Sequence, residues 1–260
     1  MVHFKHVEEV MGTAVSFEVL FAPGSERLAR SAVSRACASL HEADDDFSTW
    51  RHDTPISRFR RGDIELSEAP RVVGDVLTEC AQVRDMSGGW FDPWAMPGGV
   101  DPTGYVKGWA AQRALNVLRE FGVLAAMVNA GGDVAAVGRP RTDRPWRLGL
   151  RDPRTNNGLL GTVSLQDAGI AVSGTYERGA HITDPHTREP AAADVLSAAV
   201  VGPDLAVADG LATGLVAGGV PAARALEFVP GYTAWLLLSD GSEHRVGPFP
   251  LSQRGSFVGS

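Results

Sequence analysis

The sequence contains little cysteine, no excess of basic residues and no long apolar run. It has 260 residues, of which two are cysteine, and a net charge of −7 at pH 7. This acidic balance argues against a general nucleic-acid binder, which needs a basic face. We find neither an apolar window that approaches a membrane span nor a signal-peptide core ahead of the first strand-like residues. We therefore expect a cytoplasmic protein without a membrane span, in which both thiols are buried and no disulfide forms.

Lysine is also scarce, which draws attention to Lys107. Lysine and arginine together number 24, yet only Lys5 and Lys107 are lysine. Lys107 stands between a glycine-bearing turn and Gly108. A compact, strongly hydrated ammonium suits a phosphate oxygen, whereas the planar fork of arginine needs more room. A solvated lysine near the start of a helix explains the same residue equally well.

The apolar pattern predicts an α+β fold with largely antiparallel sheet, because the expected helices are not strictly interleaved with strands. No repeat or composition break marks a linker, so residues 1–260 are expected to form one domain, either undivided or as two intimately packed lobes. Strands are expected over residues 11–21, 125–130, 134–137, 146–150, 160–165, 170–172, 196–201 and 233–238. Helices are expected over residues 25–41, 71–86, 104–121 and 205–217, with a loop over 47–57.

Asp209 and Thr213 are four residues apart in a helical pattern, which places them on one face of the helix. Two hard oxygen donors at this spacing can share a cation such as Mg²⁺. On spacing alone, a more common explanation is an aspartate favoured by the helix dipole and a threonine that bonds back to a carbonyl.

Three further segments contain candidate functional residues. The two glycines within residues 129–133 permit either close approach of a ligand or a tight hairpin turn. In segment 173–185, His181 could transfer a proton, although an isolated loop histidine is a weak signal. Ser173 lacks the Gly-x-Ser-x-Gly elbow, so a serine hydrolase is disfavoured. The acidic run 44–46 predicts a solvated turn or helix cap rather than a metal cluster.

Considered together, these segments and several others follow a recognisable order along the chain. The ordered segments are 11–13, 47–50, 89–93, 101–108, 129–133, 173–185 and 209–213. Their order resembles the ApbE-type flavin transferase family, the FAD:protein FMN transferases, along essentially the whole chain. The resemblance implies an ApbE- or T-fold-like architecture. It also implies Mg²⁺-dependent transfer of FMN from FAD to a Thr or Ser hydroxyl of a target flavoprotein, with release of AMP.

The resemblance also implies roles for individual residues. Asp209 and Thr213, with the Gly104 carbonyl, would hold Mg²⁺, and His181 would take the proton from the acceptor hydroxyl. The residues that would contact or border FAD are Met11, Trp50, Asp92, Asp101, Lys107, Thr183 and Ala212. The same site could use water and act as a FAD pyrophosphatase, or it could hold FAD without turnover. The residues leave these alternatives open.

The sequence departs from the family pattern ahead of Asp101. The family usually has a long insertion there, whereas only Pro97, Gly98 and Gly99 separate the two motifs. We therefore expect part of the cover over FAD to be missing. The lack of an export signal leads us to expect a cytoplasmic acceptor protein.

Overall fold

The computed structural model describes residues 1–141, 143–174, 183–191 and 194–253. Its largest element is an eight-stranded sheet in the order β1-β2-β3-β4-β7-β8-β9-β10, in which every neighbouring pair is antiparallel. The strands are β1 (Val2–Val10), β2 (Thr13–Phe21), β3 (Ala125–Ala130), β4 (Asp133–Val137), β7 (Ala168–Gly174), β8 (Val195–Gly202), β9 (Thr233–Leu238) and β10 (Glu243–Val246).

A second, three-stranded sheet has the order β11-β6-β5 and is also antiparallel. Its strands are β5 (Trp146–Arg151), β6 (Leu159–Leu165) and β11 (Leu251–Gln253). The α-helices are α1 (Glu26–Phe47), α2 (Pro55–Arg60), α3 (Arg71–Met86), α4 (Thr103–Glu120) and α6 (Leu205–Leu226). Two short 3₁₀ helices are η1 (Leu66–Glu68) and η2 (Pro93–Ala95).

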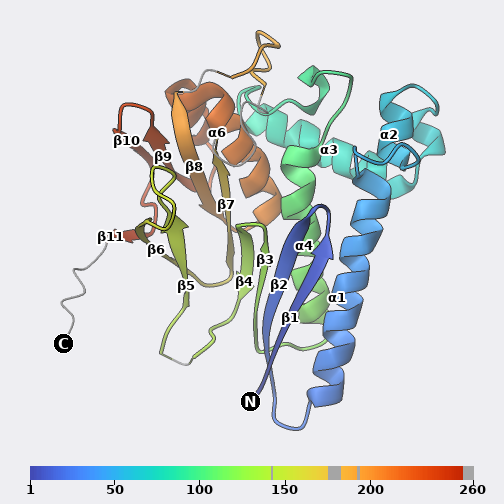
Figure 1. The fold of residues 1–260 in the computed structure, drawn as a ribbon, viewed down its shortest axis with the longest axis vertical. Coiled ribbons are helices and arrows are strands. Elements are labelled where there is room, and N and C mark those ends of the chain that lie inside the picture. The colour runs from blue at the N-terminus through green and yellow to red at the C-terminus, as the bar shows by residue number, and fades with distance from the viewer. Residues whose placement is uncertain (142, 175–182, 192–193, 254–260) are drawn as a thin grey trace.

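The middle strands of the large sheet are buried on both faces, whereas one face of the edge strand β1 is exposed. Helices α1, α4 and α6 cover one face, and the small sheet packs against the other (Figure 1). Successive residues of a strand point to opposite faces, and the two cores follow this alternation. Ala135 belongs to the core under the helices and Ala136 to the core under the small sheet, and Leu236 and Leu237 divide in the same way. The central strands are therefore largely apolar on both faces, although β4 also holds the buried Asp133.

The sequence predicted the class of the fold and most of its elements. The α+β arrangement with antiparallel sheet is confirmed, and the helix expected over residues 71–86 is α3. Val15, Phe17 and Val19 are buried on one face of β2, as the alternation predicted. The cysteines, Cys37 and Cys80, are buried and free, which confirms that no disulfide joins them.

Several predicted boundaries were wrong. The first helix continues to Phe47 instead of ending at residue 41, so the acidic run 44–46 lies inside α1 and is not a turn. The predicted loop 47–57 contains the start of α2, which begins with a proline behind a threonine cap. The last helix continues past residue 217 to Leu226, and it passes through a kink at Gly219, whose φ is 55°. A glycine in this conformation, followed by a proline, has the pattern of a helix end.

Helix α6 also corrects the expectation that no segment approaches a membrane span. Its best window has a mean hydropathy of 1.4, which by length and composition is sufficient to cross a membrane. However, 61% of that window is buried inside the protein. The packing of α6 against α4 and the large sheet accounts for its apolar character.

Candidate active site

One large cavity opens between the turn of the first hairpin, the last turn of α1, the start of α4 and the middle of α6. Its volume is about 560 Å³, which falls in the range of cofactor and ligand pockets. The predicted site residues that line it are Met11, Trp50, Asp92, Asp101, Gly104, Lys107, Thr183, Asp209 and Thr213. Segments far apart in the sequence therefore meet in one place.

Two predicted site residues are not among the lining residues. Ala212 is fully buried in the core on α6, next to Thr213, so its contact with FAD stays a prediction. His181 lies outside the described residues, and its role as a base also stays a prediction.

The buried carboxylate of Asp209 is positioned by close packing of α4 against α6. Asp209 is 3% exposed, and its Oδ2 accepts a hydrogen bond from the backbone N–H of Gly108 over 2.8 Å. A Cβ at Gly108 would lie 2.6 Å from the carbonyl oxygen of Leu205 and 2.7 Å from the Cβ of Asp209. Only glycine permits this approach, so Gly108 fixes the distance between the helices and the position of the carboxylate.

Thr213 lies one helical turn after Asp209 and faces the first turn of α4. Its hydroxyl donates to the carbonyl oxygen of Gly104 over 3.4 Å, and a Cβ at Gly104 would lie 3.0 Å from Thr213 Oγ1. A carboxylate, a hydroxyl and a carbonyl oxygen therefore border the same cavity. All three are hard oxygen donors of the kind that Mg²⁺ prefers, so the residues fit this ion.

Lys107 is held by an aspartate from the β3–β4 hairpin. Its Nζ lies 2.8 Å from Oδ2 of Asp133, which is 1% exposed, while 29% of the Lys107 side chain is exposed. The other oxygen of Asp133 accepts the backbone N–H of Val172 over 2.9 Å. The glycine pair between Asn129 and Asp133 forms a hairpin turn, so the turn hypothesis for this segment is confirmed. Gly131 of that turn also lines the cavity.

Asp92 and Asp101 also stabilise helix starts. Asp92 caps η2 by accepting the backbone N–H of Trp94 over 2.9 Å. Oδ1 of Asp101 accepts the backbone N–H of Thr103 over 3.1 Å and its hydroxyl over 2.7 Å, at the start of α4. Both carboxylates therefore have structural roles that do not depend on a ligand.

The hairpin turn at Met11 has an unusual backbone. Met11 and Gly12 have φ values of 54° and 67°, as in the two-residue turns that suit the twist of paired strands. A positive φ is uncommon for a residue other than glycine, and such strain often occurs at functional sites. Trp50, which also lines the cavity, is 85% exposed and offers an aromatic face for stacking.

The buried thiol of Cys80 is not a candidate nucleophile. Burial raises the pKa of the Cys80 thiol well above its ordinary value, and the carboxylates of Glu79 and Asp209 raise it further. Cys80 therefore stays protonated and packs as a small apolar residue.

Comparison with known proteins identifies the family. The model of the ApbE family matches residues 11–98 and 95–231. The chain belongs to the ApbE family. The FAD:protein FMN transferase of Salmonella typhimurium is 27% identical over 179 residues, which cover 65% of this chain and 51% of that protein. That of Vibrio cholerae is 26% identical over 268 residues, covering 79% of this chain and 78% of that protein. The chain thus spans about half of the Salmonella relative.

Solved structures support the same fold. The flavin transferase ApbE from Vibrio cholerae superposes with a TM-score of 0.81 at 22% identity, covering 95% of this chain and 99% of that one. The ApbE protein from Thermotoga maritima gives a TM-score of 0.84 at 20% identity, covering 96% and 100%. At these identities the likeness establishes the architecture, and the roles of the site residues depend on the geometry above.

This ApbE family member contains a residue that the sequence analysis missed and that supports the site from outside the cavity. Arg60 of α2 organises the short segment that replaces the expected insertion. Its Nε donates to the carbonyl of Gly98 over 3.0 Å, its Nη1 to Oδ2 of Asp101 over 2.9 Å, and its Nη2 to the carbonyl of Pro97. The two segments matched to the ApbE model meet at this loop. No local pattern singled out Arg60, because it lies just beyond the segment 47–57 that was expected to be a loop.

Aromatic and acidic residues at two edges of the cavity were also missed. Asp44 and Phe47 line it from the last turn of α1. Residues three apart share a helix face, but the predicted helix ended at residue 41, so this pairing was not recognised. Trp90 lines it from the segment before Asp92 and contacts the ring of His186 edge-on, with centroids 4.4 Å apart.

Proposed function

We propose that this ApbE family member transfers FMN from FAD to a Thr or Ser hydroxyl of a target flavoprotein, in a Mg²⁺-dependent reaction that releases AMP. The observation that carries the proposal is the joint position of Asp209, Thr213 and the Gly104 carbonyl in the cavity that Lys107 also lines. The curated relatives are FAD:protein FMN transferases, which supports the same substrate and acceptor.

The three oxygen donors would hold the metal ion. Bound Mg²⁺ supplies charge neutralisation at the phosphate oxygens of the pyrophosphate. Asp209 contributes a full negative charge from a buried position, which strengthens its attraction for a cation because little water screens it. Thr213 and Gly104 contribute neutral oxygens from the facing helix surfaces.

Lys107 would contact the phosphates. The protein carries a net charge of −7, so a polyanionic dinucleotide needs a local cationic group. The ion pair with Asp133 fixes the ammonium at the wall of the cavity, which reduces the reorganisation needed when a phosphate arrives. Met11 and Trp50 would border the rings and orient FAD for in-line attack.

The chemical step exchanges one phosphoester for another. The acceptor oxygen forms a bond to the phosphorus of the FMN half, and the bond from that phosphorus to the bridging oxygen breaks. The bridging oxygen leaves with AMP. The hydroxyl proton passes to a base, and we assign this role to His181, because an alcohol is a weak nucleophile until its proton is accepted.

The test is incubation of the purified chain with FAD, Mg²⁺ and a flavoprotein that contains a Thr/Ser flavinylation motif, followed by mass spectrometry of the acceptor. We expect the acceptor to gain the mass of FMN, with one AMP released for each FMN transferred. Asp209→Asn should lower the rate by more than about a hundredfold, since a metal site supplies several kcal/mol of stabilisation. His181→Ala should lower it by about 10²–10⁴-fold. The exposed carboxylate Asp143 provides the control, because Asp143→Asn should leave the rate unchanged.

Two results would contradict the proposal. Steady AMP release with an unmodified acceptor would identify a pyrophosphatase instead. FAD that stays intact with Mg²⁺ and acceptor present would identify a binding protein without turnover.

A further inference from the structure

Four side chains that commonly bind metals gather between β1 and α1, outside the cavity. His6 and Glu8 are two residues apart on β1 and therefore point to the same face of the sheet, toward the helix. Cys37 and His41 are four residues apart on α1 and share one face of that helix. One strand and one helix thus each contribute a pair of donors.

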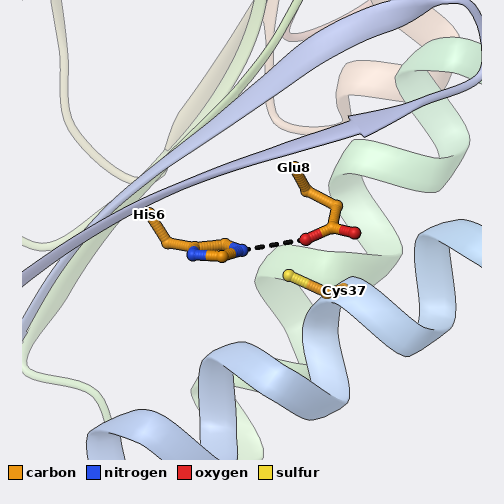
Figure 2. Close-up of side chains that lie close together, drawn as sticks. All are labelled: His6, Glu8 and Cys37. Carbon is orange, nitrogen blue, oxygen red and sulfur yellow. Dashed lines mark hydrogen bonds and ion pairs between the residues drawn. The ribbon is translucent and has the colours of Figure 1, made fainter.

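The donors are close together. Ligand atoms of His6, Glu8 and Cys37 all lie within 4.8 Å of one another, and Figure 2 shows the three side chains converging. Nε2 of His6 lies 2.9 Å from one oxygen of Glu8, and Nε2 of His41 lies 2.8 Å from the other. In a tetrahedral zinc site with bonds of about 2.0–2.3 Å, neighbouring ligand atoms are roughly 3.3–3.8 Å apart. His6, Glu8 and Cys37 therefore need only small movements to reach this spacing, whereas His41, which contacts Glu8 and lies outside the group of three, must turn toward them to complete the site.

The cluster contains one carboxylate, and its thiol must lose a proton before it can bind a metal ion. Hydrogen bonds from His41 and then His6 hold the pKa of Glu8 below its ordinary value, so Glu8 is a carboxylate at neutral pH. Burial, followed by the nearby Glu8 charge, raises the pKa of the Cys37 thiol to about 12. A thiolate beside a carboxylate is unfavourable without a positive charge between them. A divalent ion removes this repulsion, and Cys37 would release its proton to solvent when the metal binds.

We propose that His6, Glu8 and Cys37, with His41 as the fourth ligand, form a binding site for a divalent transition-metal ion, and the donor set selects Zn²⁺. Imidazole, carboxylate and thiolate together suit zinc, whereas Mg²⁺ prefers oxygen donors alone. The site is thus chemically distinct from the oxygen donors of the cavity. Its ion joins the edge strand β1 to α1, and both elements continue to the cavity wall, at Met11 and at Phe47.

The test uses Zn²⁺ and Co²⁺ with the intact chain after treatment with a chelator, in the presence of saturating Mg²⁺. We expect the wild-type chain to take up one Zn²⁺, and Co²⁺ to give a thiolate charge-transfer band that Zn²⁺ removes. Cys37→Ser should lose the band. His6 is half-exposed, and His6→Ala keeps the Cys37 thiol in place. Loss of an outer-shell partner costs about 10–100-fold in metal affinity, so His6→Ala, which removes a direct ligand, should lose more than this.

Two matched controls come from this chain. His3→Ala removes an imidazole from the opposite face of the same strand, where His3 pairs with Glu18, and should leave the band unchanged. Cys80→Ala removes the other thiol and should also leave it unchanged. A wild-type chain without the band, a band that survives Cys37→Ser, or equal Zn²⁺ affinity in His6→Ala would overturn the proposal. Zn²⁺ should also raise the melting temperature of the wild type and not that of His6→Ala, which gives an independent measurement.

Discussion

Replacement of Gly108 by alanine tests whether close contact between α4 and α6 builds the site. The added methyl group would lie 2.6 Å from the carbonyl oxygen of Leu205 and 2.7 Å from Cβ of Asp209. Both neighbours belong to α6, one of them to its backbone, so the clash cannot be relieved by a change of rotamer. The helices must separate, and the 2.8 Å hydrogen bond from the Gly108 N–H to Asp209 must lengthen.

The expected loss of unfolding free energy follows from two destabilising contributions and one that partly offsets them. Overpacking of a tight core costs about 1–3 kcal/mol. A weakened hydrogen bond to a buried charged group adds about 1.5–3 kcal/mol if it is lost completely. Alanine offsets about 1 kcal/mol of this through its higher helix propensity. We expect a net loss of about 2–4 kcal/mol of unfolding free energy, since the contributions overlap and do not add fully.

The assay is equilibrium unfolding in urea, followed by tryptophan fluorescence. Gly74→Ala in α3 is the matched control, because a Cβ at Gly74 meets nothing within 4 Å. That variant should gain about 0.5–1 kcal/mol from helix propensity alone. If Gly108→Ala is as stable as Gly74→Ala, the close contact does not constrain the two helices and the reasoning fails.

Three further predictions concern contacts around the site and at the β9–β10 edge of the large sheet. Lys107→Met should cost about 3–5 kcal/mol of unfolding free energy by leaving the carboxylate of Asp133 buried without its cation, and adding Asp133→Asn should recover most of that loss in the same urea assay. Arg60→Met should release the short loop ahead of α4 and increase its cleavage by thermolysin several-fold, measured by fragment mass, and an unchanged cleavage rate would show that Arg60 does not order the loop. A hydrogen bond from the indole of Trp235 lowers the pKa of Glu243 from 4.5, so its stabilising effect is present above that pH and is lost as the pH falls through the lowered value; the stability difference between wild type and Glu243→Gln should therefore shrink on acidification.

The sequence predicted those elements whose apolar pattern is regular and whose ends carry clear signals. Helix α3 was predicted over its full length because its buried positions recur at helical spacing and a glycine pair follows it. The buried face of β2 was predicted because apolar and polar residues alternate along it. In both cases the local pattern and the tertiary packing agree.

The errors arose where tertiary packing overrides a local signal. The acidic run at the end of α1 resembles a helix stop, yet Phe47 beyond it is buried, and its burial favours continuing the helix. Asp45 is satisfied there by Arg51, a partner that lies beyond the helix. The small residues near Gly219 resemble an end to α6, yet the chain bends and continues, and residues on both sides of the bend are buried in the same core.

At the candidate site, the sequence motifs indicated which residues belong to the site, but they did not predict which contacts those residues make with one another. For Lys107 the sequence left open a phosphate contact and a solvated lysine, and for residues 129–133 it left open a ligand-binding turn and a hairpin. In the structure the two segments contact each other, because the β3–β4 hairpin supplies the buried carboxylate that pairs with Lys107. Neither segment contains a local signal for the other, because the pairing is set by how β3 and β4 lie against α4. Lys107 keeps 29% of its side chain exposed, but its ammonium is paired with a buried carboxylate. Its position in the wall of the cavity that Asp209 and Thr213 also line makes phosphate binding there physically reasonable.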